Sequence, residues 1–166
     1  MNFGKYVTRL SLVLFTILLA SACDTGPEWA MRSYESENYS FTRFIENIER
    51  FPYTADQSKL SRVREGFKRL SLGFKKDDVK KIMGEPDFEM LHYKPKQKSE
   101  ELIYSTWSYS LKRFESNLGK WDFDVAVVLH FKPNAELYWA DPGNIAGLKH
   151  LGGPDLYPEA MITIRR

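Results

Sequence analysis

A single cysteine at the end of an apolar leader is the feature that most constrains this chain. Residues 1–22 hold two early cations, Lys5 and Arg9, then an apolar run, then small residues directly before Cys23. This order is typical of a secretory signal, and the run is shorter than the roughly 20 apolar residues of a transmembrane helix. Because Cys23 is the only cysteine, no intrachain disulfide can form. A packed core therefore has to stabilise the fold.

The end of the leader, Ala-Ser-Ala before Cys23, resembles the bacterial lipobox. In that motif the thiol is diacylated, and the cysteine becomes the first residue after cleavage. The resemblance predicts a signal peptide over residues 1–22 and a lipidation site at Cys23. Two alternatives stay open, which are an uncleaved membrane anchor and a cleaved signal that leaves a free thiol.

Cleavage after residue 22 changes the charge of the chain. The full sequence has 24 basic and 22 acidic residues, but Lys5 and Arg9 lie in the leader. The remaining 144 residues are therefore balanced in charge, and the basic isoelectric point belongs largely to the precursor. Nucleic-acid binding normally needs a basic domain, so we expect no nucleic-acid partner.

The sequence after Cys23 divides into three parts. Residues 23–39 are polar, contain Gly26 and Pro27 and show no clear periodicity, so they predict a lipidated tether. Residues 40–140 carry the periodic patterns of a folded domain. Residues 141–166 are rich in glycine and proline and predict a C-terminal extension, in which the last six residues suit a short edge strand.

The first part of the domain has helical spacing. Apolar residues recur every three or four positions over residues 40–51, after Ser40 as a suitable N-cap, and again over residues 59–70. A third, short helix follows, with Asp77 and Asp78 in its first turn and Gly84 at its end.

From residue 88 the period changes to two, which indicates strands. The expected strands are 88–93, 102–114, 121–131 and 136–140, with a charged loop over 94–101. In the second strand the pattern places Ile103 with Trp107, Tyr109 and Leu111, opposite Tyr104. Helices followed by an antiparallel meander predict an α+β fold. We expect the N-terminal helices to pack on one face of a three- to four-stranded antiparallel sheet and to leave the other face available.

One segment resembles a known family. Gly73, Val79, the Met83-Gly84-Glu85-Pro86 stop, Trp107-Ser108-Tyr109 and Phe131-Lys132-Pro133-Asn134 resemble the pattern of the small SmpA/OmlA lipoproteins, the BamE-like family. This resemblance covers roughly residues 60–140 and implies a role in β-barrel assembly at the outer membrane. The same fold resembles the repeats of the β-lactamase inhibitory protein. Both relatives imply a protein-binding role without catalysis.

Few residues of the sequence form a pattern that is typical of a catalytic or metal-binding site. The three histidines, His92, His130 and His150, stand far apart and form no metal-binding or nucleophile motif. Asp122 and Asp124 lie two positions apart on an expected strand, where two carboxylates share a face. A solvated strand face explains this pair more simply. We therefore expect no enzyme activity, no metal, no cofactor and no small-molecule substrate.

Two groups of residues are candidates for binding surfaces. Residues 59–81 have a net charge of +6, and a lipid-tethered domain can hold such cations against anionic headgroups. The candidate membrane-surface residues are Arg62, Lys68, Arg69, Lys80 and Lys81, although an ordinary solvated helix face is the alternative. The candidate protein-binding residues on the uncovered sheet face are Tyr104, Val128, His130 and Tyr138, unless the C-terminal extension covers them.

Together these patterns predict a lipid-anchored envelope lipoprotein that acts as a protein-interaction module, held on the periplasmic side of a bacterial membrane. An inhibitor or immunity-type binding protein for a secreted enzyme is the alternative. Asp24 resembles an inner-membrane retention signal of enteric bacteria, whereas the family resemblance implies the outer membrane. The outer membrane is the favoured location, and an envelope protein is the expected partner.

Overall fold

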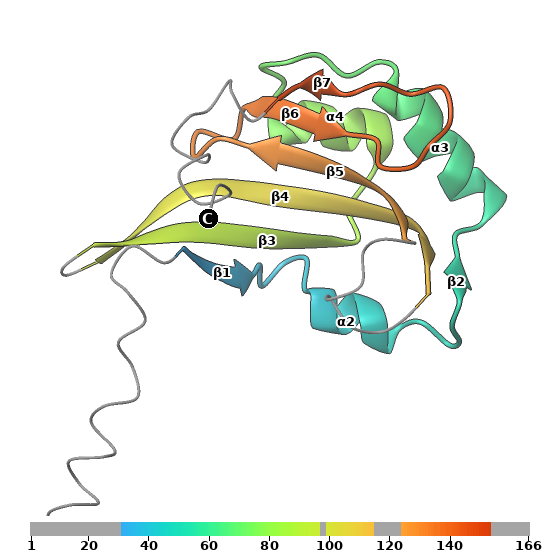
Figure 1. The fold of residues 1–166 in the computed structure, drawn as a ribbon, viewed down its shortest axis with the longest axis horizontal. Coiled ribbons are helices and arrows are strands. Elements are labelled where there is room, and N and C mark those ends of the chain that lie inside the picture. Colours follow the sequence, from blue (N-terminus) through green and yellow to red (C-terminus); the bar gives the residue numbers. More distant parts are fainter. Residues whose placement is uncertain (1–30, 97–98, 115–123, 154–166) are drawn as a thin grey trace, which may run out of the picture. The chain divides into compact units, whose positions relative to one another are not determined.

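The computed structural model describes residues 31–96, 99–114 and 124–153. Cys23, most of the predicted tether, Asp122 and the end of the C-terminal extension lie outside the described residues. The described part has an α+β fold with three helices and a seven-stranded antiparallel sheet (Figure 1). The elements in chain order are β1 Arg32–Glu35, α2 Phe41–Glu46, β2 Tyr53–Thr54, α3 Gln57–Phe67, α4 Lys76–Met83, β3 Phe88–Lys96, β4 Ser99–Arg113, β5 Val125–Phe131, β6 Leu137–Asp141 and β7 Leu151–Gly152.

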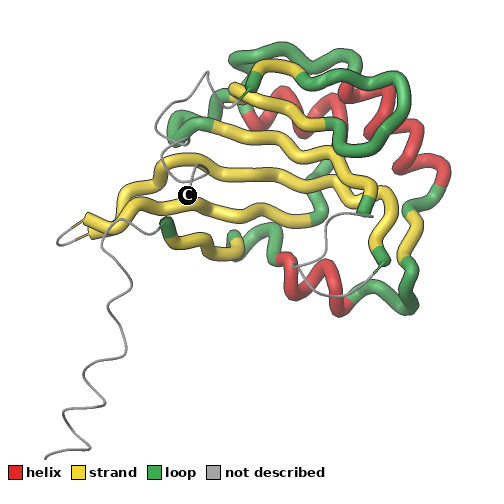
Figure 2. The backbone as a smooth tube through the Cα atoms, in the orientation of Figure 1, coloured by secondary structure: helices red, strands yellow, loops and turns green. Residues whose placement is uncertain are grey.

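The sheet has more strands than the three to four that we expected. Its order is β1-β3-β4-β5-β6-β7, and β2 pairs with β4 near the end of that strand (Figure 2). The four expected strands are present as β3 to β6. The three additional ones are short: β1 lies in the range predicted as tether, and β7 lies in the C-terminal extension. Strands of two to four residues, exposed along much of their length, leave too little alternation for a sequence pattern to detect.

The β3–β4 hairpin also replaces most of the expected loop over 94–101. β3 continues to Lys96 and β4 begins at Ser99, so these strands pair well beyond Tyr93. Pairing satisfies the backbone groups of this charged stretch, whose side chains Lys94 and Glu100 remain exposed.

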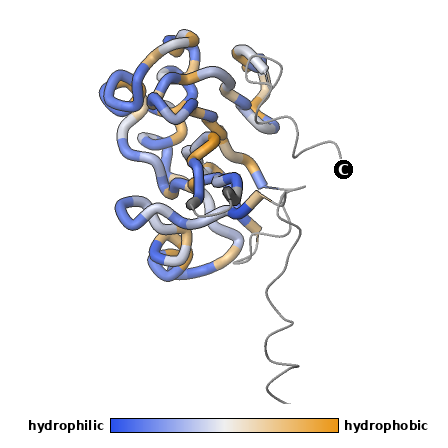
Figure 3. The backbone as a smooth tube through the Cα atoms, turned by 90° about the vertical axis from the view of Figure 1, so that its left-hand side faces the viewer, coloured by the Kyte–Doolittle hydropathy of each residue, from blue (hydrophilic) through white to orange (hydrophobic). Residues whose placement is uncertain are grey.

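Helices α3 and α4 cover one face of the sheet, here called the inner face. Val63 and Phe67 of α3 and Val79 and Met83 of α4 pack on the inward-facing residues of the sheet. Figure 3 shows how hydrophobic and hydrophilic stretches alternate along the backbone. The sheet contributes its alternating residues to this core: Trp107, Tyr109, Leu111, Val127, Leu129, Phe131, Leu137 and Ala140.

A glycine sets how closely the two covering helices approach each other. A Cβ atom added at Gly66 of α3 would lie 2.7 Å from the Cγ atom of Met83 in α4. α4 ends as expected at Gly84, whose φ of 82° suits glycine. The backbone carbonyl of Gly84 accepts a hydrogen bond of 2.9 Å from the Tyr109 hydroxyl, which fixes the helix end to β4.

Helix α2 does not join this layer, so the expectation that the N-terminal helices share one face is only partly correct. Ser40 caps it as expected by accepting from the Arg43 amide, but the helix ends at Glu46 rather than near Phe51. It lies at the edge of the sheet beyond β1 (Figure 1). Its Phe41 and Phe44 rings lie 5.0 and 5.9 Å from the ring of Phe88. Phe88 pairs with Ser108, so it points away from the inner face that Trp107 and Tyr109 occupy.

Candidate functional site

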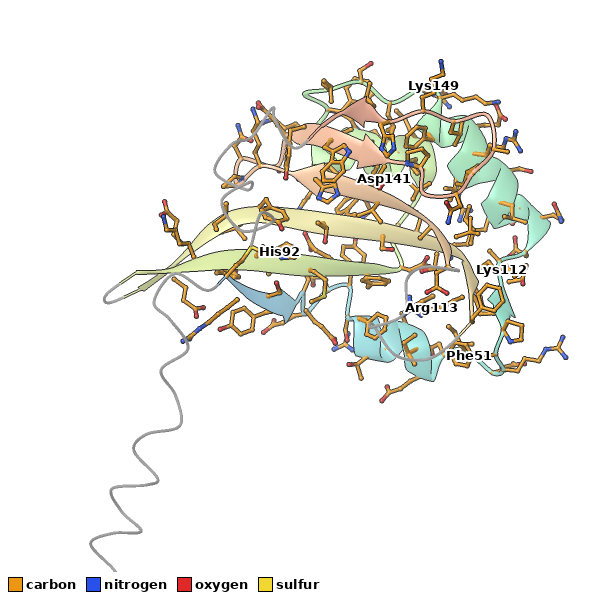
Figure 4. The ribbon with its side chains drawn as sticks, in the orientation of Figure 1. Phe51, His92, Lys112, Arg113, Asp141 and Lys149 are labelled. Atoms are coloured by element: carbon orange, nitrogen blue, oxygen red, sulfur yellow. The ribbon has the colours of Figure 1, made fainter. Side chains whose placement is uncertain are left out.

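A row of aromatic rings crosses the outer face of the sheet, the face opposite α3 and α4. Each of four neighbouring strands contributes one ring: His92 on β3, Tyr104 on β4, His130 on β5 and Trp139 on β6. We call these four residues the aromatic ladder. His92 and Tyr104 stack with ring centroids 4.2 Å apart, and His130 and Trp139 stack at 4.1 Å. Figure 4 shows His92 on the broad face of the sheet.

The ladder arises from the strand register. His92 lies opposite Tyr104, and His130 lies opposite Trp139, so each stacked pair is a direct cross-strand pair. The two pairs meet in the middle of the face, where the rings of Tyr104 and His130 are 6.2 Å apart.

Two irregularities of the register add apolar residues beside the ladder. The β3–β4 pairing shifts between His92 and Tyr93, and the extra residue is Ile103. The β5–β6 pairing shifts between His130 and Phe131, and the extra residue is Tyr138. Ile103, Tyr104 and Tyr138 form a separate buried cluster, against which Met31 and Trp139 pack. The prediction that Ile103 faces the same side as Trp107 is therefore wrong, because an extra residue in a strand breaks strict alternation.

The two histidines of the ladder are held in a neutral state. The hydroxyl Oγ of Ser33 in β1 lies 2.8 Å from His92 Nδ1, and Oγ1 of Thr106 lies 3.3 Å from His92 Nε2. The Nδ1 atom of His130 is buried and has no hydrogen-bond partner. Burial lowers the pKa of His92 to about 4 and, with the His92 ring nearby, lowers the pKa of His130 to about 3.

All four residues that we singled out for protein binding lie on this outer face, but they differ in exposure. Tyr104 and Tyr138 are 6% and 3% exposed, so they are buried and not the exposed aromatics that we expected. Val128 and His130 are half-buried. The sequence reasoning missed His92 and Trp139, which are also half-buried. Only the cross-strand register places these two residues next to the others.

The five residues that we singled out for membrane contact are all exposed and lie on α3, α4 and the turn after α3. Three of them form ion pairs within the domain: Lys68 with Glu65 at 2.7 Å, Lys80 with Glu85 at 2.7 Å and Lys81 with Asp78 at 3.4 Å. The Nε atom of Arg62 donates to the carbonyl of Met83. Neighbouring carboxylates thus offset much of the positive charge of this surface.

Two ion pairs are shielded from solvent: Lys59–Asp87 is half-buried, and Arg113–Asp124 is buried. Lys59 of α3 contacts both carboxylate oxygens of Asp87 at 2.6 and 2.8 Å, and its ammonium lies 5.6 Å from the centre of the Tyr53 ring. Burial raises the pKa of Asp87, and the charge of Lys59 opposes that rise. Arg113, 2% exposed, pairs with Asp124 at 3.3 Å.

Asp124 of the second ion pair is also one of the two carboxylates, Asp122 and Asp124, that the sequence offered as a catalytic pair. Asp124 also accepts a hydrogen bond of 2.9 Å from the backbone amide of Phe114, so both of its oxygens have partners. A buried carboxylate engaged in this way fixes the ends of β4 and β5 and is poorly placed for proton transfer. Asp122 lies outside the described residues. Among the described residues, no group of three or more metal-binding side chains occurs.

None of the helices in the described ranges is long and apolar enough to cross a membrane. No protein-family model, no curated protein and no solved structure matches the chain. The resemblance to the SmpA/OmlA lipoproteins therefore stays a prediction from the residues that carry it.

Proposed function

We propose that this protein is a lipid-anchored envelope lipoprotein that binds another envelope protein through the outer face of its sheet. The binding part of this proposal rests on the aromatic ladder, of which His92, His130 and Trp139 are half-buried, together with the half-buried Val128 on the same face. Flat surfaces that combine aromatic rings with few charges are typical of the centres of protein interfaces. The lipid anchor at Cys23 and the SmpA/OmlA resemblance support placement at the outer membrane, with assistance in β-barrel assembly or envelope maintenance as the role.

The character of the two sheet faces supports a binding role over an enzymatic one. The inner face is filled by the core, and the carboxylates of Asp87 and Asp124 serve as partners for buried cations. The histidines of the outer face are neutral at ordinary pH and stack on aromatic rings, so they offer ring surface for contact. A partner that extends over these rings removes apolar area from water, which is the main driving force of association.

Site-specific photo-crosslinking in living bacteria tests this proposal. A benzophenone amino acid replaces Val128 on the outer face, and a matched control replaces Arg69 on the opposite side of the domain; Val128 is half-buried and Arg69 exposed. We expect position 128 to crosslink to one envelope protein and position 69 not to do so. Crosslinking to a secreted enzyme instead would favour the inhibitor or immunity-type function. Equal crosslinking at both positions, or none at either, would contradict the proposed interface.

Membrane fractionation tests the anchor separately. We expect the unmodified protein in the outer-membrane fraction, with a diacylglyceryl group on Cys23 detectable by mass spectrometry. The Cys23→Ala protein loses its acylation site. If that variant and the parent showed the same cleavage and the same membrane association, the lipid anchor would be wrong.

A further inference from the structure

We infer that the protein meets the phospholipid surface with the end of the sheet formed by the start of β1 and the adjoining part of the β3–β4 hairpin. We call this region the anchor-side end and define it by Arg32, Tyr34, Tyr93 and Lys94. The inference rests on the proposed lipid anchor at Cys23 and goes beyond it, because it assigns the orientation of the domain on the bilayer. It replaces the helical cations as the membrane-contacting group.

The first argument is the length of chain between the anchor and the fold. Eight residues, 24–31, separate Cys23 from Arg32, where β1 begins. Whatever its conformation, a segment of this length spans at most about 30 Å. Arg32 pairs in register with Tyr93, so the same short connection restrains this part of the hairpin. The anchor therefore keeps this end of the sheet within about 30 Å of the lipid, and every other part of the described domain is connected to Cys23 through a longer stretch of chain.

The second argument is the position of the helical cations. Arg32 forms an ion pair of 3.3 Å with Glu100, near the start of β4. The end of α4 is fixed to the same strand at Tyr109. Glu100 and Tyr109 are nine positions apart on β4, which corresponds to about 30 Å at the rise of an extended strand. Lys80 and Lys81, near that end of α4, are therefore remote from the attachment point, and carboxylates already pair with both.

The third argument is the chemistry of the anchor-side end. Tyr34 is one of three large hydrophobic residues that are exposed in the described part of the chain, at 43%. Its ring packs edge-on against Tyr93 with centroids 5.7 Å apart, and its hydroxyl donates to Glu100. Arg32 and Lys94 are exposed on either side. Tyrosine rings with a polar tip, next to cations on flexible stems, suit the boundary between headgroups and acyl chains.

The charges of this end indicate how selective the contact is. Arg32 and Lys94 are opposed by Glu100 and Glu101 of β4, so these four side chains carry no net charge. We therefore expect contact with zwitterionic lipid as well as anionic lipid. Attraction to anionic headgroups by surface cations would instead scale with the number of unpaired basic residues.

Fluorescence labelling of the full lipidated protein tests the orientation. Because Cys23 is the only cysteine and carries the lipid, a cysteine introduced elsewhere is the only free thiol. Tyr34→Cys and Lys94→Cys report on the anchor-side end, and Lys68→Cys, at the exposed residue directly after α3, is the control. Each variant is labelled with a polarity-sensitive fluorophore and placed in nanodiscs of phosphatidylcholine, alone or mixed with phosphatidylglycerol.

We expect a blue-shifted emission and quenching by nitroxide-labelled lipid at positions 34 and 94, and neither effect at position 68, in both lipid compositions. Shift and quenching at position 68 but not at 34 and 94 would overturn the orientation while leaving the anchor intact. Response only in the anionic nanodiscs would overturn the stated contact chemistry. Mass spectrometry of the same samples tests the anchor itself, and an unmodified Cys23 would refute both proposals. The exposed Lys94 site keeps the test valid if Tyr34→Cys weakens folding.

Discussion

Both faces of the sheet carry aromatic residues, but the two faces differ in how fully their buried polar atoms are hydrogen-bonded. On the inner face, Lys76 pairs with Glu89 and lies 5.5 Å from the centre of the Trp107 ring, and the Tyr109 hydroxyl donates to a helix carbonyl. Among the described residues, three buried side-chain atoms on the outer face have no hydrogen-bond partner, Ser108 Oγ, Ser110 Oγ and His130 Nδ1, whereas on the inner face only Trp107 Nε1 has none. A buried polar atom without a partner costs free energy, so the outer face is less well optimised for stability.

This difference indicates that the inner face fixes the fold, whereas the outer face is the part of the sheet that responds to pH or to a partner. The inner face is closed by two helices and has no use for a further partner. The outer face is packed by rings of the sheet itself, and a change in charge or an added partner acts there first. Three experiments test this contrast, from the largest expected effect to the smallest.

Acid should destabilise the protein through the outer face. A histidine whose pKa is lowered on folding gives its full stabilisation above the unfolded value of about 6.5 and loses it as the pH falls toward the folded value. The folded values are about 4 for His92 and about 3 for His130. Each unit is worth about 1.4 kcal/mol, so we expect a loss of several kcal/mol between pH 6.5 and pH 4.

Urea unfolding at a series of pH values measures this loss. The His92→Phe and His130→Phe double variant keeps ring stacking but cannot take up the two protons, so its stability should change much less over the same interval. If the double variant and the parent lost stability equally, the titrating groups would lie elsewhere. Carboxylates whose pKa is lowered, such as Glu35, begin to lose their stabilisation near their unfolded value of about 4.5, but they do so equally in the parent and in the double variant, so the difference between the two proteins reports the histidines.

Alanine substitutions at two neighbouring residues of β5 compare the stability contributions of the two faces directly. Leu129 is fully buried in the inner core, whereas Val128 is half-buried on the outer face. Leu129→Ala should lower the free energy of unfolding by about 3 kcal/mol through lost burial and a cavity. Val128→Ala should cost about 1 kcal/mol or less, because part of its surface is already in water. Chemical denaturation of both variants measures the difference, and equal losses would contradict the contrast between the faces.

Substitutions in the Lys59–Asp87 pair test how much this half-buried ion pair stabilises the fold. Both side chains are 14% exposed, so removing the cation leaves a buried carboxylate without its partner. Lys59→Met should therefore lower the free energy of unfolding by about 3 kcal/mol at pH 7, and by less as Asp87 becomes protonated in acid. The double variant Lys59→Met with Asp87→Leu should recover part of the loss. A double variant less stable than Lys59→Met alone would show that the pair does not act as a unit.

Several elements could be predicted from the sequence because each has a local cause. The Ser40 cap, the start of the third helix near Asp77 and its end at Gly84 depend on neighbours within one turn. The inward-facing set on β5 follows from its strict alternation, which has no interruption. The α+β class follows from the change of period near residue 88.

Other features could not be predicted because their causes are distant in sequence. β1 pairs with a strand more than fifty residues away, and its own residues show no amphipathic pattern. The ladder joins His92 to Tyr104 and His130 to Trp139 through register, and the extra residues Ile103 and Tyr138 shift the alternation on β4 and β6. No local propensity determines such shifts.

The sequence by itself determined the lone cysteine after an apolar run, the balance of basic and acidic residues in the part that follows, and the order of helices and long strands. These properties depend on residue types and short spacings. Only the tertiary structure decided that two isolated histidines become neighbours of aromatic rings, that Asp124 is the partner of a buried arginine, and that β1 pairs with β3 of the β3–β4 hairpin. The physical reason is that strand pairing brings distant residues together, and the burial that results sets their protonation and their contacts.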